Sequence, residues 1–150
     1  MSHTYHSLLV HVVFATKDRI RTLTPEIRAR LFPLIGGIAR ERGMTALCVG
    51  GVEDHVHVLL RLPSTMDVAR AVQLIKGESS GWVAKEFPQS TFVGWQEGYG
   101  AFTIGVSQVE ATVRYIEQQE EHHRKKTFEE EFAQFLKKNH LELPGGGVFA

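Results

Sequence analysis

The sequence predicts an α+β fold, in which one antiparallel sheet is accompanied by helices. Three observations predict it: short runs of β-branched and aromatic residues alternate with segments of helical periodicity, turn residues separate the two kinds of segment, and no internal repeat is visible. The length of 150 residues corresponds to one domain with a sizeable core, and a content of 43% hydrophobic and 23% charged residues is typical of globular chains. We therefore expect residues 1–150 to form a single domain.

The first half of the chain predicts a β-α-β-β order. Residues 5–16 are rich in β-branched and aromatic side chains and contain no Gly or Pro, so they predict a buried strand, which a basic loop follows. A threonine N-cap before a proline predicts a helix over residues 25–42, because proline is favoured in the first helical turn. Residues 44–52 and 55–62 are two apolar runs around a turn, and they predict an antiparallel hairpin.

A second helix and a fourth strand should follow the hairpin. Ser64, with Asp67 three residues later, forms an acidic variant of the capping box and predicts a helix from about residue 65 into the 80s. Gly77 lies inside this helix, where glycine costs about 1 kcal/mol relative to alanine, so we expect a compensating role such as close approach of another backbone. Residues 91–105 predict a strand that bends or folds back on itself.

Two further capping boxes predict two C-terminal helices. They begin at Ser107 and Thr127, and each has a glutamate three residues later. The first of these helices should end near residue 124, and the tail of residues 141–150 should be frayed. The predicted order β-α-β-β-α-β-α-α is that of a ferredoxin-like, split β-α-β fold with additional C-terminal helices.

The composition excludes several kinds of protein. Cys48 is the single cysteine, so the chain can form no internal disulfide, and any metal must be held by nitrogen and oxygen ligands. No apolar run approaches the roughly 18 to 20 residues that a bilayer crossing needs, and the histidines within residues 1–16 are atypical of a signal peptide. We therefore expect a cytoplasmic protein without membrane contact.

The charge is balanced overall but not along the chain. There are 17 basic and 17 acidic residues, yet residues 1–85 carry 11 Lys or Arg against 7 Asp or Glu, whereas residues 86–150 carry 6 against 10. This asymmetry predicts a mildly basic surface on the first half, which would tolerate a phosphate backbone. An ordinary solvated surface of mixed charge fits the same counts.

Two histidines provide the first candidate site. His55 and His57 lie in a predicted strand, and because side chains alternate across a strand, both imidazoles should project from the same face. Such a pair can act as a bidentate metal ligand. Two half-exposed or cross-strand histidines without a metal are the alternative on spacing alone.

The third predicted helix provides the second candidate. Tyr115, Gln119 and His122 follow at helical spacing, so they should share one face. Tyr115 lies off the apolar stripe of Val109, Val113 and Ile116, so we expect it to face a site rather than the core. A packing role for the tyrosine and a solvated position for Gln119 remain the alternatives.

These groups together suit phosphodiester transfer. A divalent cation bound by His55, His57 and Gln119 could take phosphate oxygens and neutralise developing charge. Tyr115 would attack the phosphorus. Because free tyrosine has a pKa of about 10, its attack would need this positioning, and a phosphotyrosine would store the bond for rejoining without ATP.

Five segments, in this order, resemble one known family. They are HVVFATKDR at residues 11–19, DHVHVLL at 54–60, LIKGESS at 74–80, FVGWQEGYGAFTIG at 92–105 and YIEQQEEHH at 115–123. They are similar to the HUH single-tyrosine transposases of small bacterial insertion sequences and to their REP-associated relatives. The resemblance covers about residues 5–126, which leaves a C-terminal helix and tail over 127–150.

The resemblance implies a specific chemistry. The HUH pair would match His55 and His57, the nucleophile Tyr115 and the third metal ligand Gln119, with Mg²⁺ or Mn²⁺ as cofactor. The substrate would be single-stranded DNA that carries hairpins, and cleavage would leave a 5′-phosphotyrosine and a free 3′-OH. The insertion-sequence branch further implies a homodimer in which the tyrosine helix of one chain completes the site of the other, with Gly105 as a plausible hinge.

Other residues have less specific expectations. Phosphate-binding candidates are Lys17, Arg19, Arg21 and Lys76, with solvated charge as the alternative. Trp95, Tyr99 and Phe102 could stack on unpaired bases or belong to the core. The sequence leaves the roles of His11, His122 and His123 open.

Two other functions stay open beside the transposase. A domesticated REP-type protein would bind hairpins with little or no transposition. An RNA-recognition module would share the fold, but this sequence contains no Gly-aromatic strand run of the kind that such modules carry. The sequence does not reveal the cognate hairpin, the cleavage sequence, the physiological metal or whether the gene is mobile.

Overall fold

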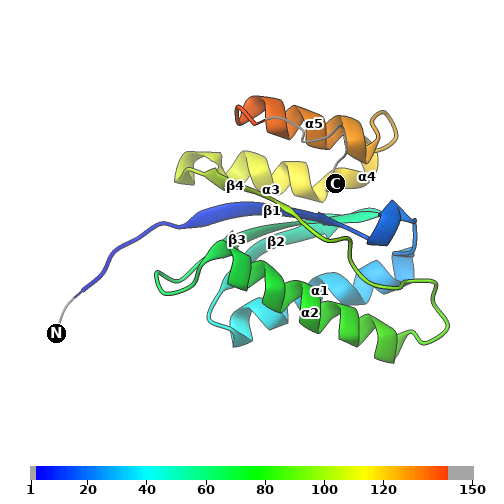
Figure 1. Ribbon diagram of the computed structural model, residues 1–150. Coiled ribbons are helices and arrows are strands. Elements are labelled where there is room, and N and C mark those ends of the chain that lie inside the picture. Colours follow the sequence, from blue (N-terminus) through cyan, green and yellow to red (C-terminus); the bar gives the residue numbers. More distant parts are fainter. Residues whose placement is uncertain (1–2, 142–150) are drawn as a thin grey trace.

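A central sheet lies between two layers of helices in the computed structural model, which describes residues 3–141 (Figure 1). The elements are β1 (Leu9–Ala15), α1 (Pro25–Glu41), β2 (Thr45–Gly51), β3 (His55–Arg61), α2 (Val68–Glu86), β4 (Gly100–Ile104), α3 (Val109–Glu117), α4 (Gln119–His122) and α5 (Phe128–Lys138). Two short 3₁₀ turns, η1 (Lys17–Arg19) and η2 (Val106–Gln108), precede α1 and α3.

The strand order confirms the predicted α+β, ferredoxin-like fold. The sheet is antiparallel with the order β2-β3-β1-β4, so β3 lies between β1 and β2 and pairs with both. This is the split β-α-β arrangement, because α1 connects two strands that a third strand separates. The additional C-terminal helices α3, α4 and α5 are also present.

The two faces of the sheet have different environments. Helices α1 and α2 cover one face, and α3, α4 and α5 cover the other (Figure 1). Val12 and Val58 face the larger core against α1 and α2, whereas Val13 and Ala15 belong to a smaller cluster with phenylalanines of α5. Because side chains alternate along a strand, His55 and His57 lie on the face that α3 to α5 cover.

Two glycines allow helices to approach this second face closely. A Cβ atom on Gly50 would lie 2.5 Å from the carbonyl oxygen of Ile116 in α3, and one on Gly100 would lie 2.6 Å from the ring of Phe132 in α5. Real Cβ atoms do not tolerate such distances. At Gly50 the obstacle is backbone, so any side chain there would push α3 away from the sheet, whereas at Gly100 the rings of Phe132 and Phe102 would have to shift.

Two predicted boundaries were wrong near the first strand and the second helix. β1 begins at Leu9 rather than at residue 5, because its partners β3 and β4 end opposite Leu9, and the preceding residues extend away from the sheet (Figure 1). The N-cap of α2 is Asp67, whose side chain accepts a hydrogen bond from the Arg70 N–H at 2.6 Å. Ser64 precedes the helix in a turn and does not cap it.

The segment 91–105 is only partly a strand. β4 covers Gly100–Ile104, while Trp95 forms one isolated bridge with Thr16. Gly94 and Gly98 have φ values of 121° and 85°, so the chain turns at both positions and cannot continue a strand.

The third predicted helix is interrupted, and its capping differs. Ser107 lies in η2, and it is the Gln108 side-chain oxygen that accepts a hydrogen bond from the Gly105 N–H at 2.8 Å. The backbone leaves helical geometry at Gln118, so α3 ends one residue earlier and α4 follows. The Thr127 cap is confirmed, because its hydroxyl accepts from the Glu130 N–H at 3.2 Å.

Within residues 3–141, none of the helices combines the length and apolarity that a membrane crossing requires. The predicted frayed tail falls almost entirely on residues 142–150, which lie outside the described residues.

Candidate active site

The floor of the site is the histidine pair on β3. The side chains of His55 and His57 are completely buried, and their ring centroids lie 5.2 Å apart. They pair in the sheet with Ala15 and Val13 of β1, which are themselves buried. Strand alternation thus places both imidazoles beneath α3 to α5, as the spacing predicts.

Each imidazole is held at its Nδ1 atom by a second side chain. His55 Nδ1 lies 2.7 Å from Asp54 Oδ1, and His57 Nδ1 lies 2.8 Å from Nε2 of His11 on β1. Because Nδ1 is engaged in both rings, the Nε2 atoms are the ones that point into the site. His11 therefore has a definite place, since it orients His57.

Helices α3 and α4 bring an amide and a phenol to the same place. Gln119 is 1% exposed, and its Oε1 lies 3.1 Å from His55 Nε2. Tyr115 is partly buried, and its ring centroid lies 5.6 Å from that of His57. The structure thus collects His55, His57, Gln119 and Tyr115 within one chain.

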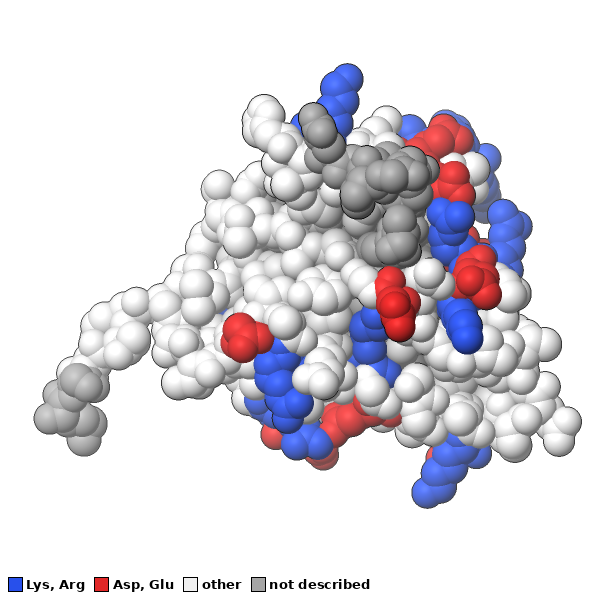
Figure 2. Space-filling view, in the orientation of Figure 1, with Lys and Arg blue, Asp and Glu red and all other residues white. Residues whose placement is uncertain are grey.

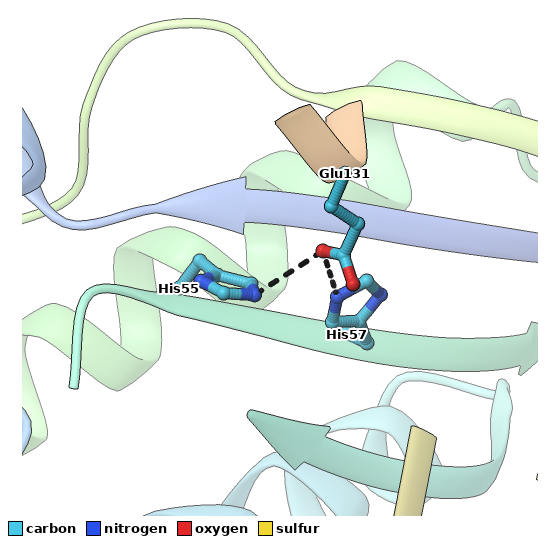
Figure 3. Close-up of side chains that lie close together, drawn as sticks. All are labelled: His55, His57 and Glu131. Carbon is cyan, nitrogen blue, oxygen red and sulfur yellow. Dashed lines mark hydrogen bonds and ion pairs between the residues drawn. The ribbon is translucent and has the colours of Figure 1, made fainter. Parts of the chain in front are cut away.

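Glu131, on α5, is the residue that the sequence analysis missed. One carboxylate oxygen lies 3.1 Å from His57 Nε2 and 3.4 Å from His55 Nε2, as Figure 3 shows. The other oxygen accepts hydrogen bonds from the Tyr115 hydroxyl and, at 3.3 Å, from the Gln119 amide. Glu131 is 4% exposed and joins every predicted member of the site.

The surroundings strongly favour an ionised Glu131 and a neutral Tyr115. Burial opposes the charge of the carboxylate, but close contacts with His123, His55 and His57 outweigh it and hold the pKa of Glu131 far below its usual range. Burial and the nearby Glu131 charge raise the pKa of Tyr115 well above that of free tyrosine. The phenol is therefore a hydrogen-bond donor in this state.

The three buried histidines differ in protonation. Burial opposes a charge on His55, but the carboxylates of Asp54 and Glu131 outweigh it and raise its pKa to about 9. Burial dominates for His57, whose pKa falls to about 4, and for His11, whose pKa falls to about 3. A neutral His11 and a neutral His57 can share one hydrogen bond, since one ring donates and the other accepts.

Two further histidines, His122 and His123, border the site. His123 Nε2 lies 3.3 Å from the carboxylate of Glu131, and its ring centroid lies 4.5 Å from that of His55. The ring of His122 lies 4.6 Å from that of Tyr115. His122, at the end of α4, and His123, directly after it, thus contact the site.

The donor set fits a divalent cation. Ligand atoms of His55, His57 and Glu131 all lie within 4.8 Å of one another, and Gln119 Oε1 adds a fourth donor beside them. Two imidazole nitrogens, one amide oxygen and one carboxylate oxygen suit Mn²⁺ well and also admit Mg²⁺, which prefers oxygen ligands.

The predicted phosphate-binding residues do not belong to the ligand set, although Arg21 lines a pocket with Asp54 and His123 at the edge of the site. Arg19 forms an ion pair of 2.7 Å with Glu129, and Lys76 donates to the carbonyl oxygens of Gln96 and Gly98 at 2.7 and 2.9 Å. Lys17 and Arg21 are exposed near η1. In Figure 2, Lys and Arg side chains are interspersed with Asp and Glu, so the face shown there carries no continuous basic stripe over the described residues.

The aromatic candidates for base stacking serve the interior. Trp95 packs edge-on against Phe14 at 4.7 Å, and its indole N–H donates to the Ser79 hydroxyl at 3.0 Å. Phe102 is 6% exposed and stacks on Phe135 at 5.3 Å. Tyr99 is partly buried against the larger core. Trp95 and Phe102 therefore pack in the interior, as the alternative to base stacking predicted.

A sequence signal for Glu131 existed. It lies in α5 on the same face as the apolar residues Phe128, Phe132 and Phe135, where a solvated glutamate is unexpected. A charge within an apolar stripe indicates a buried partner. The residues that contact Glu131 come from distant segments, including β3 and α3, and no local pattern in the sequence identifies them as its partners.

The chain is similar to transposases of bacterial insertion sequences. Residues 4–119 match the family model described as IS200-like transposase. The transposase of the insertion sequence element IS200 from Salmonella typhimurium is 27% identical over 110 residues, which cover 70% of this chain and 72% of that protein. The matched region ends at Gln119, so α5 and Glu131 lie beyond it.

Solved structures share the fold. A transposase of Deinococcus radiodurans superposes with a TM-score of 0.64 at 24% identity, covering 79% of this chain and 95% of that one. A REP-associated tyrosine transposase bound to a REP hairpin superposes with a TM-score of 0.56 at 18% identity, covering 82% and 74%. At these identities the likeness concerns the fold.

Proposed function

Because this chain belongs to the family of IS200-like transposases, we propose that it cuts and rejoins hairpin-bearing single-stranded DNA through a covalent bond between Tyr115 and a 5′-phosphate. The observation that carries the proposal is the meeting of the Tyr115 hydroxyl with the histidine pair at one carboxylate, Glu131. A phenol beside a group of cation ligands suits phosphodiester transfer by tyrosine.

The chemical step uses Tyr115 as nucleophile. Its oxygen attacks the phosphorus, the bond from phosphorus to the 3′-oxygen breaks, and the departing oxygen takes up a proton to become a 3′-OH. Glu131 accepts the phenolic hydrogen bond and so orients the Tyr115 oxygen. Because the pKa of Glu131 lies far below its usual range, the proton that Tyr115 loses passes to water rather than to this carboxylate. Rejoining is the reverse reaction, in which a 3′-OH attacks the phosphotyrosine and the phenol regains its proton.

The metal-binding residues are His55, His57, Gln119 and Glu131. A bound Mg²⁺ or Mn²⁺ would neutralise charge on the phosphate oxygens and make the phosphorus more electrophilic. Asp54 and His11 keep the two imidazoles in orientation, since each occupies an Nδ1 atom.

The phosphates on either side of the one that Tyr115 attacks would contact basic side chains. Lys17 and Arg21 are exposed and available, whereas Arg19 would have to exchange its ion pair with Glu129 for a phosphate. Lys76 is partly buried and bonded to two carbonyl oxygens, so its ammonium can offer its third hydrogen. These contacts would position the DNA strand on the protein without recognising its base sequence.

The homodimer implied by the resemblance is part of this proposal. Tyr115 lies beside the histidines of its own chain, and exchange of α3 between two chains would build the same contacts across a dimer. Mixing Tyr115→Phe protein with His57→Ala protein tests the exchange. Restored cleavage requires a shared site, and absent cleavage indicates sites made by single chains.

The direct test is covalent adduct formation. Hairpin oligonucleotides copied from the flanks of the gene are incubated with the protein and Mn²⁺, and denaturing gels report protein bound to DNA. We expect an adduct with the wild type and none with Tyr115→Phe, while both bind the hairpin equally in a gel-shift assay. Binding by the wild type without any adduct would overturn cleavage and favour the REP-type binding protein.

A further inference from the structure

A groove between α3 and α5 leads to the Tyr115 hydroxyl. Its volume is about 360 Å³, which lies within the range of roughly 300–1,000 Å³ for small-ligand sites. One wall is the face of α3 with Ala111, Thr112 and Tyr115, and the other is the face of α5 with Gln134 and Lys138. The other cation ligands lie beside its inner end, which Glu131 lines.

We propose that this groove binds one unpaired nucleobase, namely that of the nucleotide next to the phosphate that Tyr115 attacks. The inference rests on the proposed function and adds a binding site to it. A phosphate held between Tyr115 and the histidines lies at the inner end of the groove, so the adjoining nucleotide reaches the groove without leaving the strand.

The inner part of the groove is aromatic. His11, Tyr115 and Phe135 line it, and the ring of Phe135 lies 5.2 Å from that of His11 and 5.6 Å from that of Tyr115. Flat, partly apolar surfaces of this kind bind bases by stacking or edge contact, and they do so without requiring a particular base. A nucleobase suits this lining better than a sugar or a phosphate does.

The polar side chains at the two ends of the groove suit different parts of a nucleotide. Glu131 places carboxylate oxygens at the inner end, where they can accept a hydrogen bond from a base N–H. Lys138 lies at the C-terminal end of α5, is exposed and lines the groove, so its ammonium can contact the next phosphate along the strand.

Two amides supply donors for the edge of the base. The Gln108 oxygen accepts from the Gly105 N–H at 2.8 Å, and the Gln134 oxygen accepts from the Lys126 ammonium at 2.8 Å. Within residues 3–141 the NH₂ groups of these two glutamines donate to no other group. Both side chains line the groove, so both NH₂ groups can donate to carbonyl or ring-nitrogen acceptors of a base.

Photocrosslinking tests the inference without requiring cleavage. Tyr115→Phe protein is bound to hairpin oligonucleotides that carry one 5-iododeoxyuridine, moved position by position along the unpaired arms, and crosslinked peptides are identified by mass spectrometry. We expect one position to crosslink to Phe135 or His11. Ala111→Trp, which fills the groove from α3, should lower that crosslink at least ten-fold at DNA concentrations that saturate both proteins, and it should weaken DNA binding about five-fold, as loss of one stacked base does.

The control is an alanine-to-tryptophan substitution far from the groove. Ala84→Trp, at an exposed position of α2 on the opposite side of the sheet, should leave the crosslink unchanged. A second measurement changes the DNA instead of the protein. An abasic nucleotide at the crosslinking position should weaken the binding of the Tyr115→Phe protein by at least about five-fold, the effect of losing one stacked base.

The possible results separate this inference from the proposed function. Crosslinks that map only outside α3, α5 and His11, or that persist in Ala111→Trp, would overturn the groove assignment even if the wild type forms its covalent adduct. Conversely, a groove crosslink together with a wild type that forms no adduct would retain the base site and overturn cleavage.

Discussion

The hydroxyl of Tyr115 on α3 donates a hydrogen bond to the carboxylate of Glu131 on α5, while the second oxygen of that carboxylate lies 3.1 Å from His57 Nε2. One side chain thus connects the proposed nucleophile with the proposed cation site. It comes from a helix beyond residues 4–119, the part of the chain that the family model matches. The C-terminal helix therefore takes part in the site rather than merely covering it.

Substituting Glu131 should weaken cation binding. Glu131→Gln keeps an oxygen in place but removes the negative charge that attracts a divalent cation, so we expect the dissociation constant for Mn²⁺ to rise about ten-fold or more. Isothermal titration calorimetry of the protein alone measures this. Glu130→Gln, one residue earlier and exposed, is the matched control and should bind Mn²⁺ as the wild type does. Equal affinities for both variants would remove Glu131 from the ligand set.

The metal-free protein should be most stable between about pH 6 and 7. The folded pKa values of His11 and His57 are lowered to about 3 and about 4, so the unfolded chain binds protons first as pH falls below 6.5, and stability decreases there. The folded pKa of His55 is raised to about 9, so its contribution is present below pH 6.5 and is lost as pH rises toward 9.

Thermal unfolding in EDTA across this range provides the measurement. The midpoint temperature should fall on both sides of the optimum. His11→Phe removes one buried histidine, so its midpoint should depend less on pH between 6.5 and 4 than that of the wild type. An equally steep acid limb in this variant would show that His11 is not the group that titrates.

Gly50→Ala should separate α3 from the sheet. The new methyl group would lie 2.5 Å from the carbonyl oxygen of Ile116 and 2.8 Å from its Cγ2 atom, and such overpacking typically costs about 1–3 kcal/mol. Because Tyr115 precedes Ile116 in α3, covalent adduct formation should also fall. Gly36→Ala in α1, where a methyl group meets nothing within 4 Å, should instead stabilise the protein, as denaturant unfolding would show.

Gly77→Ala should raise the stability of the protein and lower its affinity for DNA. A methyl group at this exposed helical position meets no protein atom within 4 Å, so we expect a gain of about 1 kcal/mol in the free energy of unfolding. If the glycine serves the approach of a DNA backbone beside Lys76, hairpin affinity should fall at the same time. Unchanged affinity in a gel-shift titration would leave Gly77 without a role in DNA binding.

The parts of the site that were predicted from sequence depend on local periodicity. Alternation along a strand places His55 and His57 on one face, and both lie there. Helical spacing brings Tyr115 and Gln119 to one side, even though the helix is interrupted at Gln118. The family resemblance identified the same four positions, whose catalytic and metal-binding roles remain predictions.

Element boundaries were predicted less well, because they depend on what each segment meets. β1 starts where its neighbouring strands end, and the run 91–105 contributes only Gly100–Ile104 to the sheet since two glycines turn the chain before it. Ser64 and Ser107 have the residue types of caps, yet the nearby Asp67 and Gln108 make the hydrogen bonds.

By itself the sequence determined the order of elements, the common face of the histidine pair and the spacing of tyrosine and glutamine, because periods of two and 3.6 residues are properties of a chain's immediate neighbours. Only the tertiary structure decided that Glu131 and His11 reach His57, from 74 and 46 residues away. His11 reaches His57 because β1 and β3 pair as neighbouring strands. Glu131 reaches it because α5 packs against the sheet, where Gly100 leaves room for the ring of Phe132, and steric fit between distant segments is not encoded in any local pattern.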